Sequence, residues 1–313
     1  MMSTEERKTI YLCLAHMSEE GFEQKYVKEA FDTNWVVPMG PNVNAFEQNL
    51  ADFANANLDG SKLDRKVVCL SAGTAAVHLA LIACGVKAGD EVCVQSFTFC
   101  ASSHPITYLG AKPVFIDSER ETWNMDPELL EKAIVERKAV TGKYPKAIIP
   151  VALYGMPYDC ERIMAIADKY GIPVIEDGAG GMGSRFNGQV LGTFGRFGVL
   201  SFNGNKMITT SGGGALICRN EEDANNIMWH ATQARDAYPY YQHTEIGYNY
   251  RMSNVCAGIG RGQMTVLDKH IAHHKHVQAL YKELLEEVKG IHLHEQPETM
   301  NPKTGERKFY SNF

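Results

Sequence analysis

The chain has 313 residues, of which 44% are hydrophobic and 22% charged, a balance typical of a globular protein with a large core. A chain of this length allows about two domains. Lys and Arg total 31 against 37 Asp and Glu, which gives a formal charge of −6, and no long basic run occurs. The composition excludes intrinsic disorder and collagen-like or disulfide-knot architectures, and it argues against a nucleic-acid binder held by phosphate neutralisation.

Cysteine usage favours a cytoplasmic location. The 8 cysteines are scattered singly, without a C-x-x-C pair, and several stand in apolar runs, so we expect buried reduced thiols. The apolar stretch 11–15 is too short for a secretion signal, and no run is long enough to span a membrane. The cysteines are Cys13, Cys69, Cys84, Cys93, Cys100, Cys160, Cys218 and Cys256.

In chain order, apolar runs typical of strands alternate with segments of helix length. Strands are expected at 67–70, 91–94, 113–116, 147–151 and 172–175, with further apolar runs at 198–202 and 215–218. Helices are expected at 74–84, at 101–108, from Pro127 onward with Asp126 as the cap, and at 159–170. Continuous rather than alternating apolar runs suit strands covered on both faces, so the sequence predicts an α/β fold with a mostly parallel sheet.

The last part of the chain follows another pattern. A long helix is expected at 264–288, and it leads into a second, smaller unit. We therefore divide the chain into residues 1–255, an N-terminal segment with a large domain, and residues 256–313, a small C-terminal domain. Ligands of parallel sheets bind beyond the carboxyl ends of the strands, so polar residues at these ends are candidates for ligand binding.

Two motifs at strand ends suit the charged groups of a ligand. Gly73, in the run 71–74, lets the backbone approach a ligand, and the start of the next helix offers free N–H groups that suit a phosphate. An ordinary strand-to-helix turn is the alternative. Asp177 ends an apolar strand, where a carboxylate is costly to bury unless it meets a cation or donors. A capping role in a turn is the alternative for Asp177.

Two later motifs suggest a nucleophile and an interface. Lys206 lies between an apolar strand and the glycines 212–214, and a partly desolvated lysine is easily deprotonated to a nucleophilic amine. A surface-loop lysine is the commoner alternative, although the glycines imply closely packed backbone. The polar and aromatic block 247–252 has no regular period, which fits either loop packing or a contact across a subunit interface.

Together these motifs resemble the DegT/DnrJ/EryC1/StrS sugar aminotransferases, a family of fold-type-I enzymes that use pyridoxal 5′-phosphate (PLP). The resemblance runs from Met17 to the end of the chain, and its specific stretches are 34–41, 73–76, 96–99 and 192–214. It implies a large domain with a mostly parallel seven-stranded sheet between helices, plus a smaller α+β C-terminal domain. The runs 201–214 and 247–251 look most like the branch that aminates C4 of nucleotide-linked 4-keto-6-deoxy sugars.

The resemblance implies two catalytic roles. Lys206 aligns with the lysine that binds PLP covalently and then moves a proton between the substrate carbon and the cofactor. Asp177 aligns with the carboxylate that keeps the pyridinium nitrogen protonated, so that the ring acts as an electron sink. A sugar dehydratase on the same fold is disfavoured, because those relatives have histidine in place of this lysine.

The resemblance also implies which residues hold the cofactor. Gly73, Thr74 and Ser201 would bind the phosphate through amides at the helix start and one hydroxyl. Phe99 stands where the family has an aromatic ring stacked on PLP. Asn249 matches the residue that reaches the phosphate of the neighbouring subunit's PLP, which implies a homodimer with two shared active sites.

The chain departs from the family pattern in two places. Family members commonly have a polar side chain near the cofactor where this chain has Gly180, so a contact is lost. Relatives also continue well beyond a run like 310–313, and we therefore expect the small domain to be incomplete.

Two further groups carry weaker signals. The sequence predicts no metal site, because the histidines of segment 270–276 have no cysteine or carboxylate on their face to complete a tetrahedral set. These histidines are His270, His273, His274 and His276. The run 238–241, Tyr-Pro-Tyr-Tyr, is interpreted as a lid or packing loop near the sugar site rather than as a stacking platform for bases.

The resulting prediction is an aminotransferase with two half-reactions. An amino acid, by resemblance L-glutamate, gives its amine to PLP, and the amine then passes to the C4 ketone of a nucleotide-linked 4-keto-6-deoxyhexose in polysaccharide or glycan precursor synthesis. C3-keto-sugar or inosose amination would keep Lys206 and stays an alternative. A non-catalytic remnant or regulatory protein on this fold is the other alternative, supported by Gly180. No nucleic-acid or membrane partner is expected.

Overall fold

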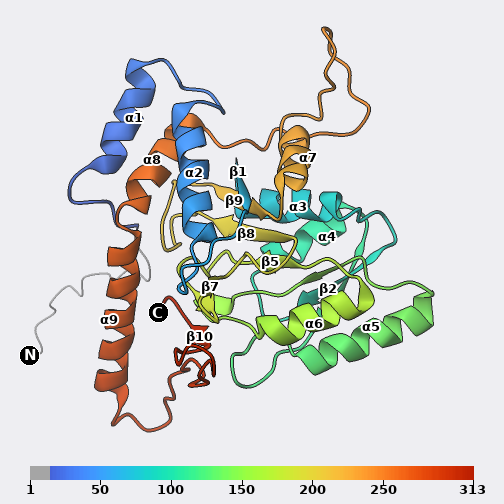
Figure 1. Cartoon of the computed structure of the whole chain (residues 1–313), viewed down its shortest axis with the longest axis vertical. Helices are drawn as coiled ribbons and strands as arrows, with labels where there is room; N and C mark the ends of the chain where they lie inside the picture. Colours follow the sequence, from blue (N-terminus) through green and yellow to red (C-terminus); the bar gives the residue numbers. More distant parts are fainter. Residues whose placement is uncertain (1–14) are drawn as a thin grey trace, which may run out of the picture.

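A mixed seven-stranded sheet forms the centre of the computed structural model, which describes residues 15–313 (Figure 1). Four strands in the order β1-β9-β8-β5 continue into three in the order β4-β2-β3. The Asp177 amide donates to the Pro150 carbonyl at 2.9 Å, and the Ala152 amide donates to the Asp177 carbonyl at 3.0 Å, so β5 and β4 are joined. The strands are β1 (Lys66–Leu70), β2 (Glu91–Gln95), β3 (Lys112–Ile116), β4 (Ala147–Ile149), β5 (Ile175–Asp177), β8 (Phe197–Ser201) and β9 (Gly214–Cys218).

Strand directions confirm the prediction of a mostly parallel sheet. In this sheet β9 is antiparallel to both of its neighbours, β1 and β8, and the other pairs are parallel. The predicted strand at 172–175 is shifted, since β5 starts at Ile175 and only a single bridge, from Val174 to Ile148, precedes it.

Helices cover both faces of the sheet, because successive strand residues point to opposite sides. Val68 and Leu70 of β1 pack in a core with helices on one face, and Val67 and Cys69 pack in a second core on the other. The first face carries α3 (Gly73–Ala83), α4 (His104–Tyr108) and α7 (Glu221–Ala231), and the second carries α2 (Pro41–Asn55), α5 (Pro127–Thr141), α6 (Cys160–Tyr170) and α8 (Asn254–Met264). In Figure 1, α3, α4 and α7 lie above the sheet, and α5 and α6 lie below it.

The predicted cap of α5 is present, and the structure adds a second cap, Asp159, that was expected within its helix. Asp126 accepts hydrogen bonds from the amides of Glu128 and Leu129, at 2.7 and 3.2 Å, directly before Pro127. Asp159 caps α6 in the same way, through the Arg162 amide at 3.1 Å. Each side chain satisfies amides that the first helical turn leaves without a partner.

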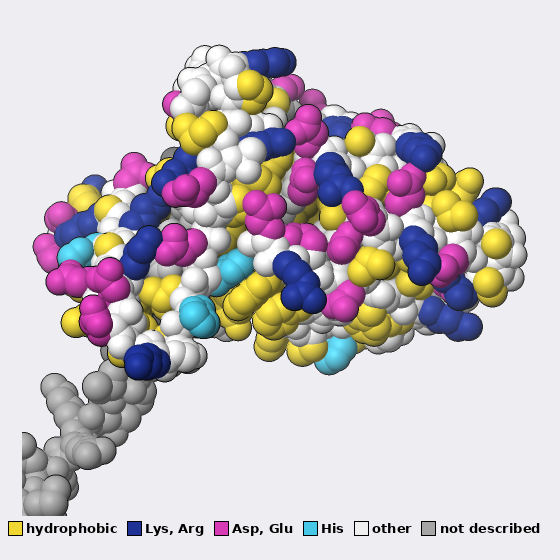
Figure 2. Space-filling view, turned by 90° about the horizontal axis from the view of Figure 1, so that it is seen from below, with side chains coloured by type: hydrophobic (Ala, Val, Ile, Leu, Met, Phe, Trp, Pro, Cys, Tyr) yellow, Lys and Arg dark blue, Asp and Glu magenta, His cyan; other side chains and the backbone are white. Residues whose placement is uncertain are grey.

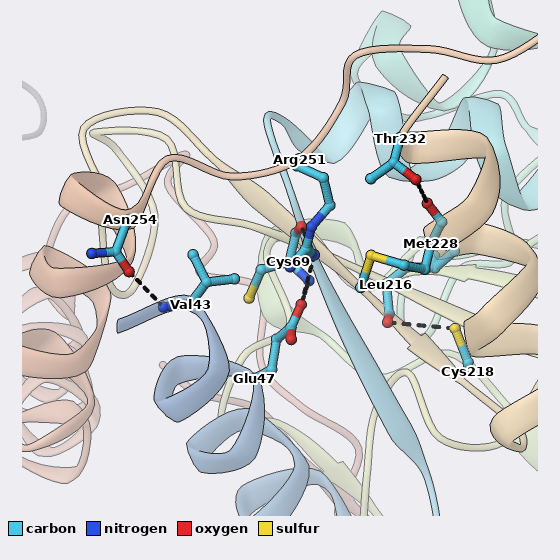
Figure 3. A network of polar contacts seen from close by, with 9 residues as sticks. All are labelled: Val43, Glu47, Cys69, Leu216, Cys218, Met228, Thr232, Arg251 and Asn254. Atoms are coloured by element: carbon cyan, nitrogen blue, oxygen red, sulfur yellow. Dashed lines mark hydrogen bonds and ion pairs between the residues drawn. The ribbon is translucent and has the colours of Figure 1, made fainter. Parts of the chain in front are cut away.

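The predicted long helix over 264–288 is present as α9 (Leu267–Leu285), with both ends shifted inward by a few residues. Val266, which has the non-helical backbone angles φ −115° and ψ 8°, separates α9 from α8, which ends at Met264. The Asn254 Oδ1 of α8 accepts hydrogen bonds from the amides of Asn42 and Val43 at 2.9 and 3.2 Å. A side chain from α8 therefore caps α2, as Figure 3 shows for Val43.

Close packing against α8 explains why its sequence is glycine-rich. A Cβ on Gly262 would lie 2.6 Å from the backbone nitrogen of Glu23, in α1 (Phe22–Asp32), and one on Gly260 would lie 2.6 Å from the Phe46 ring. The glycines let α1 and α2 approach α8 more closely than any side chain would allow. The predicted boundary at residue 255 falls inside α8, and the division into domains stays a prediction.

The C-terminal segment returns to the large unit. Strand β10 (Phe309–Tyr310) pairs with β6 (Arg185–Phe186), which pairs with β7 (Gln189–Val190). Asn312 Nδ2 donates to the carbonyls of Gly180 and Met182, at 2.9 and 2.8 Å. The end of the chain therefore lies against the loop that follows Asp177.

The surface mixes charges of both signs. On the face in Figure 2, the Lys and Arg side chains are interspersed with Asp and Glu. None of the helices described over residues 15–313 is both long and apolar enough to cross a membrane.

Candidate active site

Asp177 ends β5 at the carboxyl edge of the sheet and is only 6% exposed. Its Oδ2 accepts a hydrogen bond from Ser102 Oγ at 2.6 Å, and its Oδ1 accepts one from the Ala179 amide at 3.1 Å. In the described part of the chain this carboxylate has no ion pair with a basic side chain. A buried carboxylate of this kind is expensive unless a cation completes its environment, so the site suits a cationic group of a ligand.

The preceding carboxylate, Glu176, has a different environment. It points to the other face of β5, where its oxygens accept hydrogen bonds from the amides of Gly192, Phe194 and Gly195 at 2.9, 2.7 and 2.6 Å. Burial raises the pKa of Glu176 above its ordinary value, although the three amides act in the opposite direction. Glu176 therefore stabilises the 192–195 loop. Asp177 is the carboxylate of the two that can interact with a ligand.

A helix start and a hydroxyl meet at the same edge. Helix α3 begins at Gly73, and its N-cap residue, Ala72, has no side chain that could bond the first amides. A Cβ on Gly73 would lie 3.1 Å from the Ser201 Cβ, so the glycine allows the helix start to touch the end of β8. The amides of Gly73 and Thr74 and the hydroxyl of Ser201, together called the cradle below, are donors that suit an anion such as a phosphate.

Lys206 lies in the turn that follows β8. Its amide donates to the Asn203 carbonyl at 3.0 Å, and its side chain is half-buried. Within residues 15–313 its ammonium group has no hydrogen bond or ion pair. A Cβ on Gly213 would collide with the Thr210 hydroxyl and lie 2.7 Å from the Met252 Cε, so close packing explains the glycine at this position.

Phe99 is 76% exposed in the loop after β2. The Ser102 amide donates to its carbonyl at 3.1 Å, which closes the turn that leads into the short 3₁₀ helix η1 (Cys100–Ser102). An exposed ring so close in sequence to the partner of Asp177 suits stacking on a flat ligand.

Asn249 lies on the segment that leads to α8, and its side chain is exposed, without a hydrogen-bond partner in the described residues. The next residue, Tyr250, is joined to the turn between β1 and α3, because its carbonyl accepts a hydrogen bond from the Ser71 amide at 2.8 Å. Its ring is stacked on Tyr248 with the centroids 5.0 Å apart.

A buried ion pair holds this segment in place (Figure 3). Arg251 donates to Glu47 Oε1 of α2 at 2.7 Å and to the Cys69 carbonyl of β1 at 2.8 Å, while the Cys69 amide donates to the same Glu47 oxygen at 2.8 Å. The two side chains are 8% and 17% exposed. The pair ties the Asn249 segment to α2 and to the strand that leads into the cradle.

The structure corrects or completes several further expectations. Cys100 is exposed and Cys256 half-buried, so burial holds for five of the seven described cysteines, and Cys13 lies outside the described residues. Burial raises the pKa of the Cys84 and Cys93 thiols to about 12. The sequence reasoning missed Ser102, because a serine in a loop carries no pattern that reveals a partner 75 residues away.

Other predicted features lie apart from these contacts. His270 Nδ1 is 3.1 Å from the Met207 carbonyl, and the described residues contain no cluster of His, Cys, Asp or Glu that could hold a metal ion. The tyrosines of the run 238–241 are exposed on the long loop that projects beyond α7 in Figure 1. Gly180 has room for a Cβ, which would first meet the Gly155 backbone nitrogen at 3.4 Å.

A comparison with known families identifies the family of the chain. A model of the DegT/DnrJ/EryC1/StrS aminotransferase family matches residues 17–309. The chain belongs to the DegT/DnrJ/EryC1/StrS aminotransferase family. The predictions of fold, family, enzyme class and PLP as cofactor are confirmed.

Individual relatives agree with this assignment. The chain is 47% identical over 284 residues to a Bacillus subtilis protein, EpsN, that is named as a pyridoxal phosphate-dependent aminotransferase, covering 91% of this chain and 70% of that one. It is 36% identical to the GDP-perosamine synthase of Escherichia coli O157:H7, over 90% of this chain and 73% of that one. A DegT DnrJ EryC1 StrS aminotransferase structure from Brucella abortus superposes with a TM-score of 0.82 at 28% identity, over 92% and 73% of the two chains.

The groups at the sheet edge fit PLP. The buried carboxylate of Asp177, left without a cation, suits a pyridinium nitrogen, and the uncapped start of α3 suits a phosphate. The amine of Lys206 is a group of the kind that PLP needs for covalent attachment.

Proposed function

We propose that this aminotransferase moves an amino group from L-glutamate to the C4 ketone of a nucleotide-linked 4-keto-6-deoxyhexose, as a step toward a polysaccharide or glycan precursor. The observation that carries the proposal is the buried Asp177 carboxylate, which has no cationic partner among residues 15–313 and lies at the edge where α3 starts and Lys206 follows β8. The similarity to a GDP-perosamine synthase supports a nucleotide sugar as the acceptor.

Each residue has one task in this proposal. PLP, when bound, supplies an electron sink for the carbon that exchanges its proton. Asp177 holds a proton on the ring nitrogen, and Lys206 carries the proton to and from the substrate carbon. Gly73, Thr74 and Ser201 bind the phosphate.

Phe99 and Asn249 complete the site. The exposed ring of Phe99 covers one face of the cofactor, and Asn249 reaches the phosphate in the second subunit of a homodimer. The exposure of both side chains in a single chain supports these roles, because each would gain its partner from the cofactor or the other subunit. The unpaired cysteines of residues 15–313 support a reducing compartment, the cytoplasm.

Absorbance spectroscopy tests the first half-reaction. The purified protein with PLP should show the visible band of the lysine-bound cofactor, and L-glutamate should replace it with the band of pyridoxamine phosphate. Lys206→Ala should lack the first band, because no other amine in the proposal binds the cofactor. Lys143→Ala is the control, because Lys143 is an exposed residue in the loop after α5, and this variant should behave as the wild type.

The second half-reaction identifies the acceptor. Nucleotide-linked 4-keto-6-deoxyhexoses should restore the original band, whereas recovery with 3-keto sugars or inosose alone would favour the alternative acceptors. Absence of any band in the wild type would contradict the proposal and favour a non-catalytic protein on this fold.

A further inference from the structure

Ser102 is a fully buried hydroxyl whose partner is the carboxylate proposed to act on the cofactor. Its relative exposure is 0%, and its Oγ lies 2.6 Å from Asp177 Oδ2. An ionised carboxylate can only accept a hydrogen bond, so the Ser102 proton points at Asp177. A hydrogen bond to a charged acceptor is roughly twice as strong as one between neutral groups.

A second hydroxyl fixes the direction of this contact. Thr98 Oγ1 lies 2.7 Å from Ser102 Oγ. Because the single proton of Ser102 is already directed to Asp177, Thr98 must be the donor to Ser102. The three side chains therefore form a one-way chain of donors that ends on the carboxylate and stabilises its negative charge.

The same turn also carries the proposed stacking ring. The Ser102 amide donates to the Phe99 carbonyl at 3.1 Å, so the hydroxyl that orients Asp177 and the ring that covers the cofactor belong to one short hydrogen-bonded element. Displacement of this turn would disturb two proposed contacts together, the one between Asp177 and the edge of the cofactor ring and the one between Phe99 and its face.

We propose that Ser102, reinforced by Thr98, is a positioning residue that keeps Asp177 oriented and anionic, and thereby keeps the proton on the PLP ring nitrogen. Without the Ser102 donor the carboxylate becomes a stronger base and draws this proton toward itself. The ring is then a weaker electron sink, and proton exchange at the substrate carbon slows. This inference rests on the proposed function of Asp177.

The variants separate this role from simple filling of space. Ser102→Ala removes the donor, and Thr98→Val removes the second hydroxyl while it retains the branched shape. Ser103→Ala is the matched control, because Ser103 is half-buried in the same turn, its hydroxyl donates to the Cys100 carbonyl at 3.2 Å, and its side chain makes no capping hydrogen bond to α4.

The first readout is the ¹⁵N chemical shift of the ring nitrogen in protein loaded with ¹⁵N-labelled PLP. Ser102→Ala should move this signal toward the value of an unprotonated pyridine, Thr98→Val should move it less, and Ser103→Ala should leave it unchanged. A residue that only supports the fold would alter the unfolding temperature of the apoprotein and not this shift.

The second readout is the single-turnover rate with L-glutamate. We expect a loss of roughly tenfold for Ser102→Ala, the size that one hydrogen bond to a charged group supplies. If Ser102→Ala folds, binds PLP, and retains the wild-type shift and rate, the inference is wrong. If Ser102→Ala does not fold, Thr98→Val decides by the same two measurements. A wild-type protein without the visible band would overturn the proposed function instead, so the two failures are distinguishable.

Discussion

Two neighbouring carboxylates at the end of β5 have opposite tasks because a strand sends successive side chains to opposite faces. Glu176 is satisfied by three backbone amides, whereas Asp177 meets one hydroxyl and one amide and has no cation among residues 15–313. The first is a structural group, and the second suits a ligand. Asp177 could be singled out from the sequence, by its place at a strand end and by the family resemblance, but the structural role of Glu176 was not predicted.

Replacement of Glu176 tests its structural role. Glu176→Ala leaves three buried amides without an acceptor, and we expect the free energy of unfolding to fall by about 3 kcal/mol. Burial raises the pKa of Glu176 above its ordinary value of 4.5. The contribution of Glu176 to the free energy of unfolding is therefore complete below that value, and it declines as pH rises through the folded-state pKa. The loss measured by urea unfolding should therefore be larger at about pH 4 than at about pH 8.

A surface glutamate provides the control for this experiment. Glu128 forms a salt bridge with Arg162 on the exposed side of α5, and Glu128→Ala should change the free energy of unfolding by no more than about 0.5 kcal/mol. An equal loss for the two variants would contradict the structural role of Glu176.

At the scale of elements, close approach rather than helix propensity determines the sequence of α8. Glycine is a weak helix former, so the run that contains Gly258, Gly260 and Gly262 gave no helix prediction. The reason for these glycines lies in α1 and α2, which pack against them and which the sequence reasoning also did not predict. Elements with a continuous apolar run, such as β1, β2 and β8, were predicted to within about a residue or two.

Gly262→Ala tests this explanation. In an open helix the change would stabilise the protein by up to about 1 kcal/mol. Here the new Cβ would lie 2.6 Å from the Glu23 amide nitrogen, and we expect a net loss of about 1–3 kcal/mol in urea unfolding. Gly212→Ala is the control, since no atom lies within 4 Å of its added Cβ. A stabilised Gly262→Ala variant would show that α1 is not held closely against α8.

At the scale of the whole molecule, the proposed homodimer predicts complementation between two defective chains. Lys206→Ala lacks the proposed amine, and Asn249→Ala lacks the group offered to the other subunit. A mixed dimer of the two contains one site with an intact Lys206 and an intact Asn249. We expect this mixture to recover up to half of the wild-type activity per dimer after the subunits are allowed to exchange.

The measurement is glutamate-dependent turnover of the exchanged mixture, with the dimer identified by sedimentation. Each variant alone, treated in the same way, is the control. Activity no greater than the sum of the separate variants would contradict shared sites. The sequence predicted this arrangement only through the family resemblance, because a residue that serves a second chain leaves no periodic pattern in its own.

The ion pair between Glu47 and Arg251 has a consequence for how this chain can vary. Each side chain also bonds the backbone of Cys69, so a single substitution leaves one charge in the interior without its counterpart. Accepted changes at the two positions should therefore occur in pairs, and a lineage that loses one member should lose or replace the other. In a set of descendants, positions 47 and 251 would behave as a single inherited character, although 204 residues separate them.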